Sequence, residues 1–384
     1  MNRRRLGYDA PFKPYYFSGC VLWLRADLGI TTVDAAVVDG SDLTTAAWTK
    51  TNCTATATQI TDSNDGVPTS HSVLENAPTA LQINHIATST FDLRAGTLGW
   101  VQCWCGDNSY AYVNLATGAI GITYQATAST ADLGGGWWRL TMTSTVGIST
   151  DNLYVFTANA NGGSSYIGNG LGTIFVTNIT VTQRNVNQRT DRTGLGHHIQ
   201  QAVAASRPQL NQSDVSFAGT PAIEGDGVDD FLTTVATYGA AGAATAVCAW
   251  RGLVASADAG VFGGTLTEST IAITHHSGGN AYCYAGDGFC SAAQALNQTA
   301  ILTGTWTGGV AVNGIRLRRD GLQIAQGTAV VAGVAQALRQ LQLSFGTAGR
   351  AKMGECAWFD RVLGVEELLM LERNFGARAG VPVP

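Results

Sequence analysis

The sequence predicts an all-β protein built from two nested antiparallel β-sandwiches, with a short helix near its C-terminus. Composition is the first reason: hydrophobic residues make up 45% of the 384 residues and charged residues only 13%, with 47 Gly against 8 Pro. Low charge with much Gly, Thr, Ala and Val favours short strands and tight turns over a helical bundle or a disordered chain. Alternating apolar and polar runs between Gly, Asn and Asp turns are the second reason, and a charge shift within the chain is the third.

The predicted strands are short and follow one another at the spacing of a β-sandwich. Residues 18–30 (SGCVLWLRADLGI) begin with a buried strand and continue into a turn. Within it, Val21 and Trp23 point to one face and Leu22 and Leu24 to the other, because neighbouring strand residues alternate. The later strands are predicted, in chain order, at 99–105, 110–114, 137–144, 152–158, 173–182, 215–217, 231–234, 246–253, 271–275, 300–306, 315–319, 341–345 and 354–359.

The predicted helix covers residues 365–375, where leucines and Phe375 form an apolar stripe. Glu366 and Glu367 lie in its first turn, where negative charge is favourable beside the positive end of the helix dipole. Gly376 is the expected end of the helix, because glycine accepts the left-handed backbone of a C-terminal cap.

The charge shift separates residues 39–188 from the rest of the chain. This stretch has nine Asp or Glu and four Lys or Arg, whereas the remainder has 18 of each. We therefore expect 39–188 to be a module inserted into a discontinuous unit made of 18–38 and 189–384, with residues 1–17 as an N-terminal arm. Neither part has the basic stripe that binding to a phosphate backbone needs, so nucleic acid is not an expected partner.

Two signals bear on the place of synthesis. The apolar runs are too short to cross a bilayer, and the basic start MNRRRLGYDAPFK lacks the apolar core of a signal peptide. We expect a protein made in the cytoplasm, without Sec-type export and without membrane insertion.

Four pieces of the outer segments form a recognisable pattern. They are VLWLRADLGI (21–30), TDRTGLGHHIQQAVAASRP (190–208), PAIEGDGVDDFLTT (221–234) and GECAWFDRVLGVEELLMLERNFGARAG (354–380). Together they resemble the concanavalin A-like, laminin-G-type jelly rolls common in phage structural proteins. In that pattern the turn at 191–196 follows soon after the first strand. Here about 150 residues intervene, so the resemblance itself places an insertion.

The insertion has its own pattern. Its pieces are AAWTKTNCTATA (46–57), DGVPTSHSVLEN (65–76), YVNLATGAIG (112–121), DLGGGWWRLTMT (132–143) and SSYIGNGLGTIFVTNITV (164–181). They resemble the carbohydrate-binding-module-like sandwiches of phage tail and fibre proteins. The two resemblances cover nearly the whole chain after residue 17, but both folds host binding, structural and catalytic proteins.

The resemblances imply a phage virion protein on the particle surface, made in the bacterial host cytoplasm. As a head fibre, decoration, tail or collar protein, it would display glycan-binding-type sandwiches and attach the particle to host surface polysaccharide. Two alternatives stay open: a purely structural capsid, collar or tail component without a ligand, and a virion-borne polysaccharide-degrading enzyme. Such proteins usually form symmetric homo-oligomers, and a trimer is expected before a dimer.

Exposed aromatic side chains are the candidates for glycan binding, because aromatic rings stack on the apolar faces of pyranose rings. The candidates in the insert and beside a Gly-Asp-Gly turn of the outer unit are Trp104, Tyr110, Tyr112, Tyr124, Tyr282 and Tyr284. The alternative for each is ordinary core packing, which is expected for most aromatic residues of the chain.

The N-terminal arm mixes basic and aromatic residues and is stiffened by Pro11 and Pro14. We interpret it as a docking segment for another virion subunit. The residues proposed to make that contact are Arg3, Arg4, Arg5, Tyr8, Phe12, Lys13, Tyr15 and Tyr16.

Support for catalysis is lacking in the sequence. There is no GxSxG motif, and no pair of carboxylates stands out as a glycosidase would require. The adjacent histidines at 197–198 and at 275–276 cannot chelate as pairs in extended chain, since neighbours point to opposite faces. We therefore expect a non-enzymatic protein without a cofactor.

A cluster of aspartates and a pair of cysteines are candidates for a metal site and for a disulfide. Asp226, Asp229 and Asp230 form a group that could hold Ca²⁺, but a tight turn with Asp side chains accepting backbone N–H bonds is the preferred interpretation, so no metal is expected. Among the eight cysteines no CxxC pair occurs. Cys283 and Cys290 flank a turn in CYAGDGFC and are candidates for a cross-strand disulfide, whereas buried thiols are the expectation for most of the others.

Overall fold

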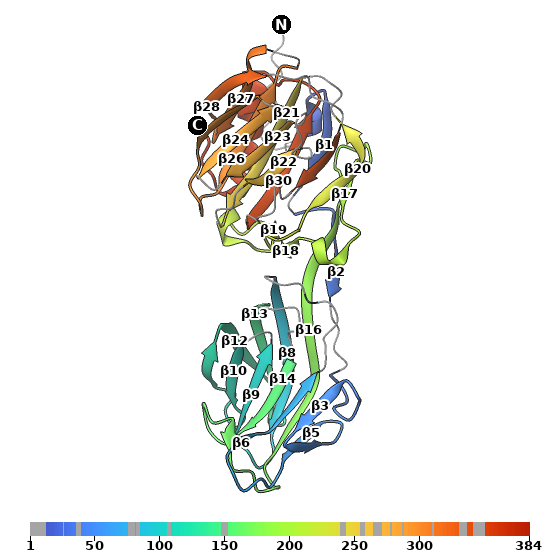
Figure 1. Ribbon diagram of the computed structural model, residues 1–384, viewed down its shortest axis with the longest axis vertical. Helices are drawn as coiled ribbons and strands as arrows, with labels where there is room; N and C mark the ends of the chain where they lie inside the picture. Colours follow the sequence, from blue (N-terminus) through green and yellow to red (C-terminus); the bar gives the residue numbers. More distant parts are fainter. Residues whose placement is uncertain are drawn as a thin grey trace. The chain divides into compact units, whose positions relative to one another are not determined.

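The computed structural model describes residues 13–25, 27–35, 40–75, 81, 85–105, 109–146, 153–238, 243–253, 258–263, 271–276, 279–285, 288–308, 311–329, 336–340 and 350–384. In this part of the chain the structure is mostly β, with antiparallel sheets and one α-helix (Figure 1). The all-β fold class predicted from the sequence is confirmed. Within the same residues, no helix is long and apolar enough to cross a membrane.

The chain divides into two compact units. The inserted unit is Asp34–Arg184, and the outer unit consists of the residues up to Val33 together with Asn185–Pro384. The boundaries expected from the sequence lie at 38/39 and 188/189. Strand β16, Thr173–Arg189, contributes residues to the pairing in both units.

The inserted unit has two main sheets. The first contains, in spatial order, β11 (Ile120–Tyr124), β10 (Tyr110–Asn114), β9 (Trp100–Cys105), β14 (Leu153–Ala158), β7 (Ser72–Glu75) and β3 (Trp48–Thr51). The second contains β12 (Ala126–Gly134), β13 (Trp137–Thr145), β8 (Ile86–Ala95), β16, β5 (Gln59–Asp62) and β4 (Cys53–Ala55). A short pair, β6 (Thr69–Ser70) and β15 (Ser165–Tyr166), completes the unit.

One hydrophobic core holds these two sheets together. Val101 and Cys103 enter it from β9, and Phe91 and Leu140 enter it from β8 and β13. Every second residue is buried from Ile86 to Phe91 on β8 and from Leu140 to Ser144 on β13, as the alternation of a half-buried strand requires. The residues between them point away from the core, and this rule positions the candidate site described below.

The outer unit also has two layers. One contains β18 (Gln209–Asn211), β19 (Ala222–Gly225), β30 (Ala351–Phe359), β1 (Cys20–Leu24), β21 (Ala244–Gly252), β26 (Ala300–Trp306), β27 (Ala311–Arg319) and β28 (Leu322–Ala329). The other contains β17 (Ile199–Gln200), β20 (Leu232–Tyr238), β29 (Gln336–Gln340), β22 (Asp258–Gly263), β23 (Ile271–His276), β24 (Asn280–Ala285) and β25 (Gly288–Ala293). Strand β2 (Ile30–Ala35) follows β1 along the chain.

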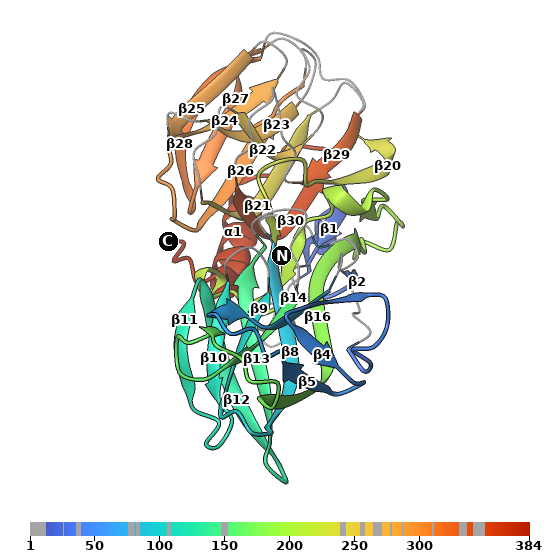
Figure 2. The same ribbon diagram turned by 60° about the horizontal axis from the view of Figure 1, so that its bottom comes forward.

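Strand β30 illustrates how this unit buries both faces of a sheet. Trp358 lies in the core between the layers, whereas Phe359 lies in a second core on the opposite face. Helix α1 (Val365–Ala379) covers that opposite face with Leu371 and Phe375, beside β21 and β26 (Figure 2). The buried Arg318 guanidinium donates to both carboxylate oxygens of Glu372, at 2.9 and 3.0 Å, and so fixes α1 to β27.

The predicted helix runs further than expected, to Ala379 instead of Phe375. Gly380, with φ +71, takes the left-handed cap that was assigned to Gly376. Gly376 lies inside the helix, and its role is steric: a Cβ on it would lie 2.5 Å from the carbonyl oxygen of Val381.

One predicted strand is wrong. Residues Val215–Phe217 form a short 3-10 helix, as do Pro14–Tyr16 and Ala204–Ser206. The Asp214 carboxylate accepts the backbone N–H of Ser216 and starts the turn, and Ala218 ends it with a left-handed backbone. The predicted strand 341–345 lies outside the described residues. At each of the other predicted positions the structure has a strand.

Glu75 gives the inserted unit a predictable response to pH. Its side chain is buried, and burial raises its pKa from the ordinary 4.5 to about 7. Because the folded pKa exceeds the unfolded one, the stabilisation from the bound proton is complete below the unfolded pKa. It is lost as the pH rises through the folded value, an effect of about 3 kcal/mol at most.

We therefore expect the thermal stability of the inserted unit to fall between about pH 5 and pH 8. Glu75→Gln should remove most of this dependence, whereas Asp132→Asn, at an exposed acid of the same unit, should keep it. Calorimetric unfolding of the full chain across this range is the measurement. A wild-type curve that is flat or rises with pH would contradict the assignment.

Candidate functional site

A row of aromatic side chains crosses the first sheet of the inserted unit. Tyr124 pairs directly with Tyr110, Tyr110 with Trp104, and Trp104 with Tyr154, so the row spans β11, β10, β9 and β14. Their neighbours Cys103, Ala111 and Val155 belong to the core. Since strand neighbours alternate, the aromatic residues lie on the outer face of the sheet. We call the set Trp104, Tyr110, Tyr112, Tyr124, Tyr154 and Phe156 the aromatic face.

The rings of the aromatic face are in contact with one another. The centroids of Tyr124 and Tyr110 lie 5.7 Å apart with planes at 22°, and those of Tyr110 and Trp104 lie 5.4 Å apart at 24°. Trp104 continues to Tyr154 at 5.8 Å and to Phe156 at 5.5 Å. These are offset or tilted arrangements, which are favourable for aromatic pairs and hold the rings in fixed positions.

Exposure differs along the aromatic face. Tyr124, on the edge strand β11, is 49% exposed, while Trp104, Tyr110 and Tyr154 are half-buried. Tyr112 is only 3% exposed, and its hydroxyl donates to Ser164 Oγ at 3.0 Å. Tyr112 therefore contributes packing beneath the row, and its neighbours reach the solvent.

Gln102 lies on the same side of β9 as Trp104 and pairs with Tyr112 and with Phe156. Its side chain is 3% exposed, and its Oε1 atom has no hydrogen-bond partner. The Nε1 atom of Trp104 is also buried and has no hydrogen-bond partner. A buried polar atom without a partner is costly, so this part of the aromatic face is not optimised for stability alone.

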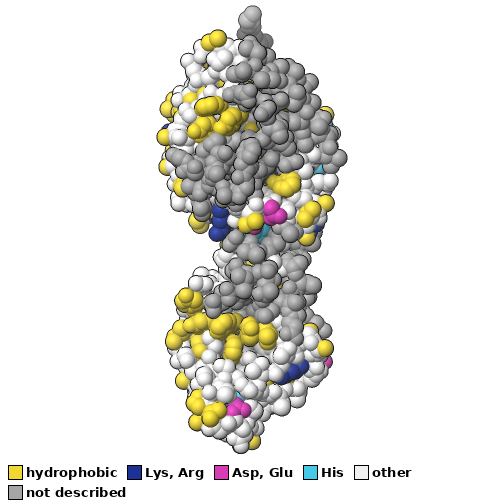
Figure 3. Space-filling model, in the orientation of Figure 1, with side chains coloured by type: hydrophobic (Ala, Val, Ile, Leu, Met, Phe, Trp, Pro, Cys, Tyr) yellow, Lys and Arg dark blue, Asp and Glu magenta, His cyan; other side chains and the backbone are white. Residues whose placement is uncertain are grey.

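Charge is absent from the outer side of these strands. On β9, β10, β11 and β14, all of whose residues are described, no Asp, Glu, Lys or Arg occurs. Figure 3 shows a band of hydrophobic side chains on the inserted unit, where Figure 1 draws β9, β10 and β14. The exposed surface here is apolar and aromatic, with hydroxyl and amide groups as its polar component.

Four of the predicted glycan-binding residues meet in this one place, namely Trp104, Tyr110, Tyr112 and Tyr124. The sequence interpretation missed Tyr154, Phe156 and Gln102. The alternation within the predicted strand 152–158 puts Tyr154 and Phe156 on one face, but their placement beside Trp104 depends on pairing between distant strands.

The other two predicted aromatic residues form a smaller cluster in the outer unit. Tyr282 and Tyr284 stack on β24, with centroids 5.6 Å apart and planes at 12°. Phe289 on β25, 52% exposed, contacts both rings at 5.5 and 5.7 Å. This cluster has half as many rings as the aromatic face and does not extend into a row.

Cys283 and Cys290 are directly paired across β24 and β25, and both are buried free thiols close enough to hydrogen-bond. Burial raises the pKa of the Cys283 thiol. Cys248 and Cys356 are likewise paired across β21 and β30, which sequence spacing could not reveal.

We expect oxidation of the full chain by oxidised glutathione to join Cys283 to Cys290, with loss of two hydrogen atoms from the pair. The crosslink closes a short loop and should stabilise the outer unit by about 2 kcal/mol. Peptide mapping by mass spectrometry and thermal unfolding are the measurements, with Cys290→Ser as the control. Retention of both thiols under oxidant, or a crosslink from Cys283 to another cysteine, would refute the pairing.

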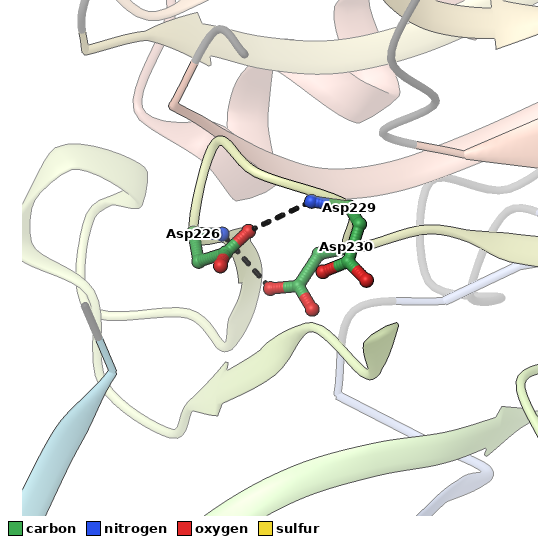
Figure 4. Close-up of side chains that lie close together, drawn as sticks. All are labelled: Asp226, Asp229 and Asp230. Atoms are coloured by element: carbon green, nitrogen blue, oxygen red, sulfur yellow. Dashed lines mark hydrogen bonds between the residues drawn. The ribbon is translucent and has the colours of Figure 1, made fainter. Parts of the chain in front are cut away.

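The three aspartates form a hydrogen-bonded turn between β19 and β20 (Figure 4). Asp230 Oδ2 accepts the backbone N–H of Asp226 at 2.8 Å, and Asp226 Oδ1 accepts that of Val228 at 2.7 Å. Ser206 Oγ donates to Asp229 Oδ2 at 2.8 Å. These bonds fit the tight-turn interpretation, because each carboxylate stabilises the loop.

A small cavity of the outer unit includes two carboxylates, Asp27 and Glu355, with Arg378 and Phe375. Burial raises the pKa of Glu355. Its Oε1 accepts from Trp23 Nε1 at 2.5 Å, and its Oε2 accepts from Arg378 Nε. Both oxygens are thus engaged in joining β1, β30 and α1, which fits a structural role better than proton transfer.

Most of the N-terminal arm is not described. The proposed docking residues that lie outside the described range are Arg3, Arg4, Arg5, Tyr8 and Phe12. Lys13 is half-buried, Tyr16 is 60% exposed, and only the backbone of Tyr15 is described.

Comparison with models of protein families and with curated proteins gave no match. Among solved structures, the chain is similar to the receptor binding domain of botulinum neurotoxin D (TM-score 0.37, 9% identity, covering 48% of this chain and 49% of that one). It is also similar to an arabinofuranosidase complexed with arabinofuranosyl-alpha-1,2-xylobiose (0.36, 12%, 52% and 52%). A third is Trypanosoma rangeli sialidase in complex with sialic acid (0.35, 9%, 85% and 62%).

The chain spans about half the length of the first two of these structures. TM-scores below 0.4 and identities of 9–12% assign it to none of these families. The class that the structure defines is an all-β protein of antiparallel β-sandwiches with one C-terminal helix.

Proposed function

We propose that the inserted unit binds carbohydrate on a bacterial surface through the aromatic face. The observation that carries this proposal is the row of directly paired aromatic side chains, Tyr124, Tyr110, Trp104 and Tyr154, on the outer side of four strands that contain no Asp, Glu, Lys or Arg. Aromatic rings stack on the C–H faces of pyranose rings, while amide and hydroxyl groups bond the sugar hydroxyls. A rigid sheet holds such rings in place and lowers the entropy lost on binding.

The wider role that we propose is a phage virion protein, in which the two sandwiches are displayed on the particle. This part rests on the resemblance of the sequence segments quoted above. Many copies on one particle would turn weak sites into firm attachment, because the second and later contacts occur at high effective concentration. The protein would act as a homo-oligomer, a trimer before a dimer, and without catalysis.

A structural component without a ligand is the second candidate. An exposed apolar patch is also typical of a subunit interface, so the aromatic face would then be covered by a second copy or another virion protein. Binding and oligomeric state, measured on the same preparation, separate the two candidates.

We expect Trp104→Ala and Tyr124→Ala each to weaken binding to host surface polysaccharide about tenfold, or about 1.4 kcal/mol, by removing a stacking ring. Leu133→Ala is the control, because Leu133 has a similar exposure of 47% on β12, in the other sheet of the unit. The measurements are glycan-array binding and calorimetry on the full chain, with circular dichroism to verify folding. Equal binding by the folded variants and the wild type would exclude the aromatic face.

The N-terminal arm is proposed to attach the protein to the particle. Deletion of residues 1–16 should abolish incorporation into particles while both units remain folded. Quantification of the protein in purified virions, with unfolding curves of the truncated chain, is the test. Normal incorporation of the truncated protein would rule out the arm as the docking segment.

A further inference from the structure

We infer that the ligand of the aromatic face is an uncharged glycan chain that runs across the strands, with one sugar residue at each ring of the row. This inference rests on the proposed function and adds the chemical class, direction and length of the ligand. Three observations carry it: the line of the rings, the positions of the basic residues, and the polar groups beside the row.

The row defines the direction. Directly paired residues on adjacent strands lie on a line perpendicular to the strands, so Tyr124, Tyr110, Trp104 and Tyr154 form a straight sequence. The successive centroid distances are 5.7, 5.4 and 5.8 Å. At these distances the nearly parallel rings of Tyr124, Tyr110 and Trp104 overlap partly face to face. A glycan chain that follows the row would therefore lie along the outer edges of the rings and meet one ring on each strand.

No Lys or Arg of the inserted unit lies on the outer side of the four described strands that form the row. The sequence from 34 to 184 contains only four basic residues, Lys50, Arg94, Arg139 and Arg184. Lys50 lies on β3 of the same sheet, but it is paired with the core residue Val73 and is therefore on the inner side. Arg94 and Arg139 belong to β8 and β13 and Arg184 to β16, all of them strands of the second sheet. Loops beside the row therefore cannot supply a positive charge either, because they contain no Lys or Arg.

Three of these basic groups are also engaged. Arg139 Nε donates to Asp92 at 2.7 Å, and the Arg94 guanidinium lies 4.8 and 4.4 Å from the Trp137 and Phe175 ring centroids. Lys50 Nζ donates to the carbonyl oxygen of Trp48 at 2.7 Å. Recognition of carboxylate, sulfate or phosphate on a sugar normally uses Arg or Lys. With an excess of five negative charges between 39 and 188, the unit would repel an anionic chain.

The polar groups beside the row are neutral. Ser164 Oγ bonds the Tyr112 hydroxyl, and the Asn161 side-chain oxygen accepts the backbone N–H of Ile122 on β11 at 2.8 Å. Gln102 adds a buried amide on β9. Such groups match sugar hydroxyls, which both donate and accept hydrogen bonds. The second sheet, by contrast, presents the Arg139–Asp92 ion pair and a set of threonines.

The test uses the full chain with two sets of probes. One set consists of neutral β-glucan oligosaccharides of increasing length, and the other of polyuronate or sulfated chains of equal length. We expect calorimetric affinity for a neutral series to rise up to four sugar residues and then to level off. Binding should change little with salt, because no ion pair forms. Tyr124→Ala should lower affinity for the tetrasaccharide about tenfold (1.4 kcal/mol) and shorten the preferred chain by one residue, and Leu133→Ala should do neither.

The outcomes separate the inference from the proposed function. Tight, salt-sensitive binding of the anionic chains through Trp104 would overturn the inference and leave carbohydrate binding at this face intact. Equal affinity for disaccharide and tetrasaccharide would overturn the row of four subsites. No binding of any glycan, with self-association that Trp104→Ala abolishes, would refute both and identify the face as a subunit interface.

Discussion

The alternation of strand residues across a buried sheet is the constraint from which the rest of this structure follows. The strands of the two main sheets of the inserted unit turn one side toward a common core, so Val101, Cys103 and Val155 face inward. The same register forces Trp104 and Tyr154 outward. A slip by one residue would exchange the two sets, and the large cost of exposing the core forbids it. The core therefore fixes the aromatic row as firmly as any direct contact between the rings.

In the outer unit, one sheet is apolar on both faces and contributes to two hydrophobic cores. Trp358 enters the core between the layers, and Phe359 enters the core beneath α1. A sheet buried on both sides needs a cover, and the C-terminal helix provides it. The buried pair of Arg318 and Glu372 then fixes the helix on the sheet, since removing either partner would leave an unpaired charge.

Low charge connects the fold with the proposed ligand. In the sequence, low charge indicates strands and turns. In the structure, it leaves β9, β10, β11 and β14 without Asp, Glu, Lys or Arg. Three of the four basic residues of the inserted unit serve instead as partners of Asp92, of aromatic rings and of a backbone carbonyl oxygen. An aromatic surface that lacks ions is suited to neutral, hydroxyl-rich chains.

The sequence by itself determined the all-β class, nearly all the predicted strands and the helix, because polarity alternation and turn residues are local signals. A short apolar run can mislead, as at Val215–Phe217, where Asp214 caps a 3-10 helix and no strand forms. Local signals also fail where a glycine serves a close contact, as Gly376 does against Val381. Only the tertiary structure decided that Tyr154 stands beside Trp104, and that Cys248 faces Cys356. Pairing between strands far apart in the chain is set by the burial of a shared core, and no short stretch of sequence contains that information.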